Sequence, residues 1–190
     1  MSIITEAQLR QFQRPFKKGL QESLIEYRNQ EKYLKTTIFL SHKHNELEFL
    51  ANTVELLKSL NTNIYVDWLD EGMPKNTSGE TAKRIKKKIV ECDKFILLAT
   101  EAAISSKWCN WELGLGDAAK FDKNIAIFPI RKEGQTFTGS EYFQIYPSIQ
   151  YENGLTKYFN GNYIPEGYYV ERYNNDNTKS IEPLGLWLFK

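Results

Sequence analysis

The fold is decided by the stretch KFILLAT at residues 94–100, together with SSKWCNWEL at residues 105–113. The first part is an apolar run of strand length, and from Ser105 the spacing of apolar residues becomes helical. Glu112 is an acidic residue among apolar and aromatic neighbours in that helix. Because a helix that follows a strand starts at the carboxyl end of the sheet, where open α/β folds bind ligands, Glu112 is a candidate functional residue.

Strand and helix patterns alternate on both sides of this stretch. An Asn at position 45 can cap one helix, and TSGE at 77–80 offers a capping box for the next. Such alternation predicts a parallel sheet with helices on both faces. We expect strands at 36–41, 63–67, 94–100 and 124–130, a fifth near 148–151, and helices at 45–60, about 78–91, 105–121 and 141–147.

The two ends of the chain differ from this pattern. Residues 1–35 are polar with an apolar residue every three or four positions, interrupted by Pro15 and Gly19, which predicts an N-terminal helical extension of one broken helix or two short ones. Its apolar stripe covers either the flank of its own domain or another subunit. The remaining residues, 36–190, form one domain, and its tail from 167 to 189 predicts a hairpin or a strand plus a segment.

Composition limits the function classes. The chain is 41% hydrophobic and 26% charged with a net charge of +1, which describes a soluble globular protein without a field that attracts nucleic acid. The basic run at 83–88 falls on the solvent face of an amphipathic helix, and a nucleic-acid site is the less favoured alternative. Apolar stretches fall short of the roughly 18 to 20 residues of a membrane span, and no leader is visible, so we expect a cytoplasmic protein without a membrane partner.

The cysteines and histidines do not form a metal motif. Cys92 and Cys109 are too few and too far apart for a metal knuckle or a disulfide framework, and we expect both to be reduced and buried. His42 and His44 lie two positions apart in a loop, without other ligands at matching spacing. The sequence therefore predicts no metal site.

Three segments resemble Toll/interleukin-1 receptor (TIR) domains. The pattern Ser-x-Trp-Cys-x-x-Glu-Leu at 106–113 is similar to the glutamate-bearing helix of bacterial and plant members that cleave NAD+. TIFLSHKH at 37–44 resembles the first strand and the loop after it, and NIYVDW at 63–68 resembles the second strand as it enters the so-called BB loop. The resemblance covers residues 36–130 in register. It implies a flavodoxin-like fold with a five-stranded parallel sheet in the order 2-1-3-4-5.

The resemblance assigns Glu112 the role of catalytic glutamate. Cleavage of the nicotinamide N-glycosidic bond passes through an oxocarbenium-like cation and releases a neutral leaving group, so one carboxylate can suffice. Trp108 and Trp111 can exclude water, and the dipole of the helix is expected to keep Glu112 ionised. The alternative is a structural glutamate that only stabilises the start of the helix.

Further candidate residues would bind NAD+. By resemblance, Ser41, His42 and Lys43 line the pocket, with Ser41 donating to a phosphate or ribose oxygen and Lys43 neutralising the pyrophosphate; the alternative is a polar turn. Trp108 is a further NAD+-binding candidate. Asp67 and Trp68 open the loop that, by the same resemblance, covers the site, and Trp68 either anchors this loop or stacks on a ring of the substrate. The chain lacks a Gly-rich phosphate cradle, which favours NAD+ as a consumed substrate and predicts no bound cofactor.

The sequence thus favours an NAD+ glycohydrolase or ADP-ribosyl cyclase. The resemblance implies self-association through TIR–TIR contacts and, for a stand-alone bacterial member, a Thoeris-like role in antiphage defence, in which a separate effector protein senses an ADP-ribose-derived product. One rival is a non-catalytic TIR adaptor. Another is a receiver-like phosphoacceptor that uses Asp67, but a receiver needs an acidic cluster where this chain has Ser41 and His42.

Overall fold

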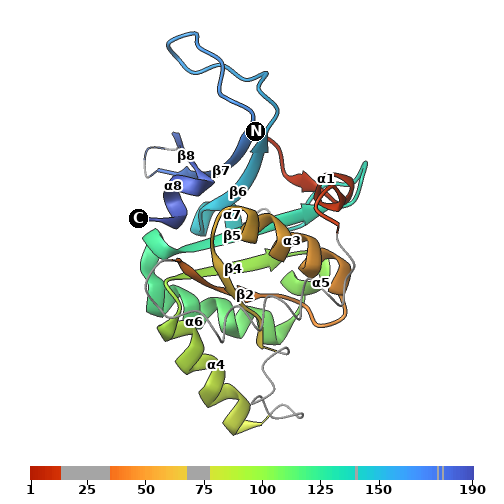
Figure 1. Ribbon diagram of the computed structural model, residues 1–190, viewed down its shortest axis with the longest axis vertical. Helices are drawn as coiled ribbons and strands as arrows, with labels where there is room; N and C mark the ends of the chain where they lie inside the picture. Colours follow the sequence, from red (N-terminus) through yellow and green to blue (C-terminus); the bar gives the residue numbers. More distant parts are fainter. Residues whose placement is uncertain (14–34, 68–77, 140, 175, 177) are drawn as a thin grey trace.

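The computed structural model describes residues 1–13, 35–67, 78–139, 141–174, 176 and 178–190. Strands and helices alternate through most of these residues (Figure 1). The strands are β1 (Ile4–Thr5), β2 (Thr37–Ser41), β3 (Asn63–Tyr65), β4 (Lys94–Ala99), β5 (Ile125–Arg131), β6 (Ser148–Glu152), β7 (Gly167–Tyr173) and β8 (Lys179–Pro183). The helices are α1 (Glu6–Arg10), α3 (Leu47–Ser59), α4 (Gly79–Glu91), α5 (Glu101–Ile104), α6 (Lys107–Asn124), α7 (Tyr142–Ile145) and α8 (Leu184–Leu188).

The sheet has the order β3-β2-β4-β5-β6-β7-β8, and β1 pairs with β5. Pairing is parallel from β3 to β6, which confirms the predicted five-stranded order 2-1-3-4-5. The sheet is larger than predicted, because the antiparallel hairpin of β7 and β8 extends it beyond β6. All six residues of β4 are buried, as is typical of a central parallel strand covered on both faces.

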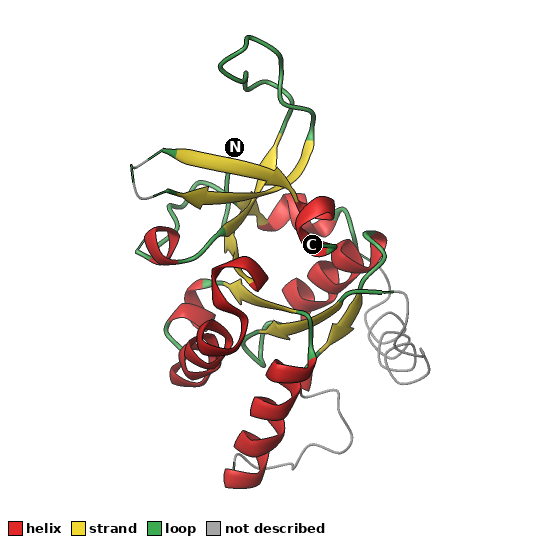
Figure 2. Cartoon of the chain, turned by 90° about the vertical axis from the view of Figure 1, so that its left-hand side faces the viewer, coloured by secondary structure: helices red, strands yellow, loops and turns green. Residues whose placement is uncertain are grey.

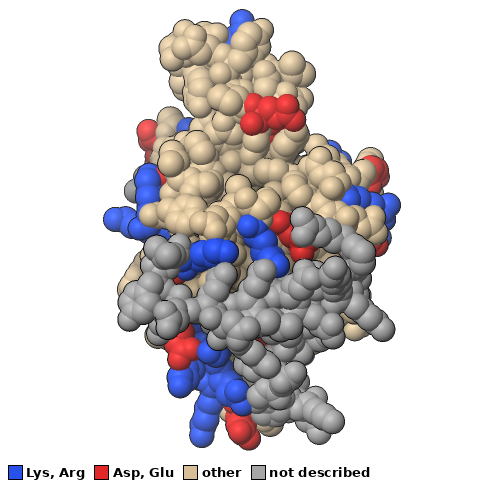
Figure 3. Space-filling model, in the orientation of Figure 1, with Lys and Arg blue, Asp and Glu red and all other residues tan. Residues whose placement is uncertain are grey.

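Helices cover both faces of the sheet (Figure 2). Successive strand residues point to opposite faces, so Ile38 and Leu40 join one core and Phe39 joins the other. The first core is completed by α1, α3 and α8. The second core is completed by α4, α5 and α6, and the exposed lysines of α4 lie opposite its buried Ile85 and Ile89, on a basic surface visible in Figure 3. The basic run is therefore a solvent-exposed helix face.

The N-termini of the helices at the carboxyl end of the sheet differ in detail from the predicted ones. Ser78 caps α4 in a capping box with Thr81, one position later than the box predicted at 77–80. The cap of α3 is Glu46 and not Asn45, and the Glu46 side chain makes no capping hydrogen bond. The helix predicted at 105–121 corresponds to α6, which is capped by Ser106, and it is preceded by the short α5, capped by Thr100, which the sequence pattern does not predict. Each cap oxygen accepts a backbone N–H of the first turn, which fixes where these two helices begin.

The N-terminal residues are only partly helical, which corrects the prediction of a helical extension for residues 1–13. Ile4 and Thr5 form a strand parallel to the end of β5, and Ile4 is completely buried. A strand of two residues has too short a pattern to be recognised by alternation. Residues 14–34 lie outside the described residues, so the rest of the extension and the domain boundary at 35/36 stay predictions.

The C-terminal segment folds as the predicted hairpin, followed by α8. Leu184, Trp187 and Leu188 of α8 are buried in the first core. Among the helices of the described ranges, none combines the length and the apolar character needed to cross a membrane.

Candidate active site

The candidate site is built around a hydrogen bond between β2 and α6. Ser41 is the last residue of β2, and its hydroxyl donates to Glu112 Oε2 over 2.6 Å. Glu112 lies in the second turn of α6 and is only 2% exposed. The close approach of α6 to the sheet depends on Gly116, where a Cβ atom would lie 2.7 Å from the ring of Phe95. The fold therefore brings the predicted catalytic residue to the carboxyl end of a central strand.

The environment of Glu112 favours its protonated form. Burial, followed by the charge of Asp67, raises the pKa of Glu112 to about 8, and the hydrogen bond from Ser41 and the side chain of Trp108 oppose this rise only in part. The expectation that the helix dipole keeps this carboxyl ionised is therefore wrong. Glu112 lies too far into α6 and too deep beneath the surface for the dipole to outweigh its desolvation.

His42 is buried rather than part of an exposed polar turn. It is 3% exposed, and its Nδ1 atom lies 3.2 Å from the carbonyl oxygen of Leu40. Burial lowers the pKa of His42, although the nearby Asp67 acts in the opposite direction. The ring is therefore neutral near neutral pH, with Nδ1–H donating to Leu40 and Nε2 left as an acceptor.

Asp67 links the two histidines of this region. One of its carboxylate oxygens lies 3.9 Å from His42 Nδ1, and the other lies 3.7 Å from Nε2 of the half-exposed His44. Its charge also reaches Glu112. Asp67 thus sets the electrostatic potential of the site from the end of the β3 segment.

Two buried polar atoms of the site have no hydrogen-bond partner among the described residues. They are Glu112 Oε1 and His42 Nε2. Buried polar atoms are satisfied in most native structures, and exceptions commonly mark a place for water or a ligand. Both atoms belong to residues for which the family resemblance implies a role in catalysis or substrate binding.

Cys109 is a site residue whose contribution the sequence does not reveal. Its thiol donates to the carbonyl oxygen of His42 over 3.3 Å, which joins α6 to the loop after β2. Burial raises the pKa of this thiol, so Cys109 is held in its neutral form. The signals in the sequence are its place in the Ser-x-Trp-Cys-x-x-Glu-Leu pattern and its position three residues before Glu112 on the same helix.

The other predicted residues lie around this centre. Lys43 is half-buried, and its positive charge acts to lower the pKa of both Cys109 and Glu46. Trp108 is half-buried with its ring centroid 4.7 Å from that of Trp111, and both rings pack against the second core. Trp68 lies outside the described residues. The substrate-binding roles of all these residues stay predictions.

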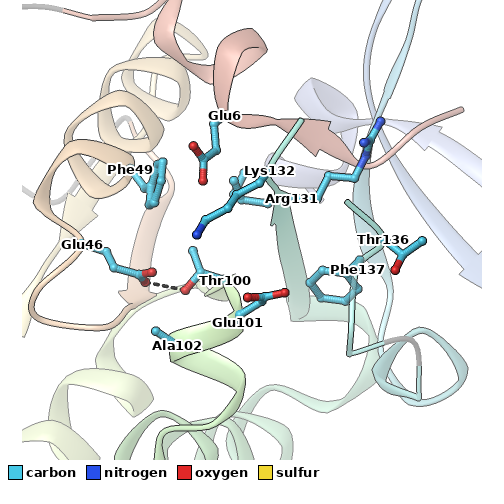
Figure 4. A pocket seen from close by; sticks show the side chains of 11 residues that line it. Glu6, Glu46, Phe49, Thr100, Glu101, Ala102, Arg131, Lys132, Thr136 and Phe137 are labelled. Carbon is cyan, nitrogen blue, oxygen red and sulfur yellow. Dashed lines mark hydrogen bonds between the residues drawn. The ribbon is translucent and has the colours of Figure 1, made fainter. Parts of the chain in front are cut away.

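A pocket of about 130 Å³ lies at the carboxyl ends of β4 and β5, between α1, α3 and α5 (Figure 4). Its main polar contact is the hydrogen bond from the Thr100 hydroxyl to the Glu46 carboxylate, and the Lys132 side chain points toward this pair. Burial raises the pKa of Glu46. Glu112 and Ser41 do not line this pocket, so the pocket is not the centre of the candidate chemistry. The sequence pattern does not indicate it.

Metal ligation finds no support in the described ranges. In them, no group of three or more His, Cys, Asp or Glu side chains is arranged to hold a metal ion. Cys92 and Cys109 are free and buried.

Comparison with known proteins gives one family. A family model described as TIR domain matches residues 38–158, from β2 to the loop after β6. The matched segment contains Ser41, Asp67 and Glu112. No curated protein matches the chain.

Proposed function

The chain belongs to the TIR domain family, and on this basis we propose that it is an enzyme that cleaves NAD+ between nicotinamide and ribose. The observation that carries the proposal is the buried carboxyl group of Glu112, held by the Ser41 hydroxyl at the carboxyl end of β2. Open α/β sheets bind their ligands at this edge. The family includes NAD+-cleaving enzymes as well as adaptors, so the activity itself rests on this site.

The proposed reaction needs one negative group beside the ribose. The bond between the ribose C1′ atom and the pyridinium nitrogen breaks, and its electron pair leaves with neutral nicotinamide. The ribosyl group then carries an oxocarbenium-like positive charge, which the Glu112 carboxylate stabilises in a site that excludes water. Attack by water gives ADP-ribose and a proton, and attack by a group of the same molecule gives a cyclic product.

The raised pKa of Glu112 is compatible with this role because the substrate is cationic at the reacting ring. A positive charge near a carboxyl group favours the ionised form and lowers its pKa. Bound NAD+ would therefore ionise Glu112 when the nicotinamide ring lies beside it. A carboxyl group with a pKa of about 8 is then inactive without substrate and active with it.

The surrounding residues have defined parts in the proposal. Ser41 positions the Glu112 carboxylate with its O–H donor and accepts a hydrogen bond from a ribose hydroxyl with a lone pair. Lys43 neutralises the pyrophosphate, and His42 offers its unpaired Nε2 atom to a ribose hydroxyl. Asp67, Trp68 and Trp108 complete the binding site. NAD+ is the substrate, and no further cofactor takes part.

The biological part of the proposal follows from the family resemblance. We place the enzyme in the cytoplasm, with self-association through TIR–TIR contacts, and we assign it to a Thoeris-like antiphage defence in which a separate effector protein senses the ADP-ribose-derived product.

One observation favours a non-catalytic adaptor as the second candidate. Glu112 is only 2% exposed, so the site must open before a substrate can reach its carboxyl group. An adaptor would need no such opening, and in it the hydrogen bond between Ser41 and Glu112 would serve only to hold α6 against β2.

Chromatography of NAD+ incubated with purified protein tests the proposal. Wild-type protein at high concentration should release nicotinamide, and Glu112→Gln, which preserves shape and removes charge, should lower the rate about 100-fold or more. Asp117→Asn on the same helix is the matched control and should cleave at the wild-type rate. Absence of cleavage by wild-type protein across the tested concentrations, or full cleavage by folded Glu112→Gln, would reject the catalytic role.

A further inference from the structure

A second pocket lies at the opposite end of β4 from Glu112. Its volume is about 710 Å³, within the range of about 300 to 1,000 Å³ typical of small-molecule sites. Lys94, at the start of β4, contributes to it together with the end of α6, the hairpin of β7 and β8, and α8. Its lining consists of Lys94, Lys123, Asn124, Arg172, Glu182, Trp187 and Lys190. We refer to it as the basic pocket.

Positive charge dominates the basic pocket. Four of its lining side chains are basic, and Glu182 is its single acidic side chain. Glu182 forms an ion pair with Lys190, and the lining as a whole carries more basic than acidic side chains. Figure 3 shows basic side chains at the left edge of the molecule, near the C-terminus. Such an excess in a concave site attracts anions.

Lys94 is the most unusual of these residues because it is a lysine in a central strand. It is 2% exposed, its Nζ atom donates to Asn124 Oδ1 over 2.6 Å, and the same atom lies 4.6 Å from the centroid of the Trp187 ring. Within the described residues it has no carboxylate at ion-pair distance. Burial lowers the pKa of Lys94, which reflects the free-energy cost of this poorly compensated charge.

The hydrogen-bonding capacity of the pocket is also unfilled. An ammonium group has three donors, and Lys94 uses one of them on Asn124. The buried indole nitrogen of Trp187 has no acceptor among the described residues. Both groups are donors only, so the missing partner must be an acceptor, and an anion would satisfy both.

An apolar hollow of about 440 Å³ continues from the basic pocket. The two share Arg172, Glu182, Trp187 and Lys190. The hollow adds apolar side chains, among them Pro183 and Leu186, and Leu186 is 60% exposed. A ligand that fills both parts therefore has an anionic end and an apolar or aromatic end.

We propose that the basic pocket binds an organic phosphate. The phosphoryl group is held by Lys94 and Lys123, and the organic part lies over Pro183 and Leu186. A phosphoryl group offers three acceptor oxygens and up to two negative charges, which match the unused donors and the excess positive charge better than a single carboxylate does. The site is separate from the one proposed for NAD+ cleavage.

Isothermal titration calorimetry with phenyl phosphate and inorganic phosphate tests this inference. Wild-type protein should bind phenyl phosphate saturably and more tightly than inorganic phosphate. Lys94→Met and Lys123→Ala should each weaken binding of phenyl phosphate tenfold or more, since each removes a charge-assisted contact. Lys123 is exposed, so its replacement tests the site even if Lys94→Met fails to fold.

Two matched variants distinguish binding in the basic pocket from binding elsewhere on the protein. Lys83→Ala removes an exposed lysine of α4 outside the pocket and should leave binding unchanged. Glu112→Gln should also bind phenyl phosphate normally, whether or not the protein cleaves NAD+. Absence of binding, an equal loss in Lys83→Ala, or inorganic phosphate binding as tightly as phenyl phosphate would each overturn the inference.

Discussion

The charge of Asp67 raises the pKa of Glu112, which connects the end of the β3 segment to the second turn of α6. Together with burial, this interaction holds Glu112 protonated until the pH approaches about 8. The pair therefore determines both how the stability of the protein depends on pH and when the proposed catalytic carboxylate forms.

Glu112→Gln should change how stability depends on pH. The pKa of Glu112 is about 4.5 in the unfolded chain and about 8 in the folded state, so its contribution to stability is fully present below about 4.5. Between these values the folded state binds the extra proton. Wild-type stability should therefore fall relative to Glu112→Gln as pH rises through this window, by up to about 1.4 kcal/mol per pH unit.

Urea unfolding of both proteins at several pH values in that window measures this difference. Other titrating groups, including Glu46, are common to both proteins and cancel in the comparison. A difference in unfolding free energy that does not vary with pH would show that Glu112 titrates alike in the folded and unfolded states.

Asp67→Asn should move the pH dependence of NAD+ cleavage. The proposed reaction requires ionised Glu112, so kcat/KM for wild-type protein should increase with pH and level off above the pKa of about 8. Removing the Asp67 charge lowers that pKa, so the rise should occur at lower pH in the variant. Asp176→Asn, an exposed carboxylate in the loop before β8, is the control and should leave the profile unchanged. A profile that shifts upward in Asp67→Asn contradicts the electrostatic role of Asp67.

The arrangement of the strands is predictable from the sequence because the decisive residues are local. The runs at β2, β4 and β5 are apolar on both faces, as required of buried parallel strands. β1 is not evident in the sequence because Ile4 and Thr5 carry too little pattern, and their pairing depends on the distant end of β5. Asn45 is the better cap by residue type, whereas tertiary contacts place Glu46 there beside Thr100.

The sequence predicts which residues come together in the candidate site, but it does not predict their protonation states. Glu112, Ser41 and Asp67 follow from strand ends and helix starts, which the sequence pattern indicates. The protonation state of Glu112 depends on complete burial and on Asp67, which are properties of the folded chain. The basic pocket is not predictable, because Lys94 has the pattern of a polar strand start and its neighbours come from three other segments.

Ser41→Ala should destabilise the protein and suppress the proposed activity together. The hydroxyl of Ser41 is the hydrogen-bond donor to Glu112 Oε2, and its removal leaves a buried carboxyl group with fewer partners, at a cost of about 1 to 3 kcal/mol. The same hydrogen bond lowers the pKa of Glu112, so its loss should raise that pKa further. Thermal unfolding and a pH profile of NAD+ cleavage check both effects, and a profile identical to wild type would exclude Ser41 as a positioning residue.

Two glycines on α6 offer a matched test of how closely this helix must approach the sheet. At Gly116 a Cβ atom would lie 2.7 Å from the Phe95 ring, whereas at Gly114 no heavy atom lies within 4 Å. Gly116→Ala should therefore cost about 1 to 3 kcal/mol through overpacking and displace α6, which carries Glu112. Gly114→Ala should stabilise the helix by about 0.5 to 1 kcal/mol, because alanine loses less backbone entropy. Melting temperatures should then move in opposite directions by a few degrees, and equal shifts in both variants would show that α6 does not depend on close contact at Gly116.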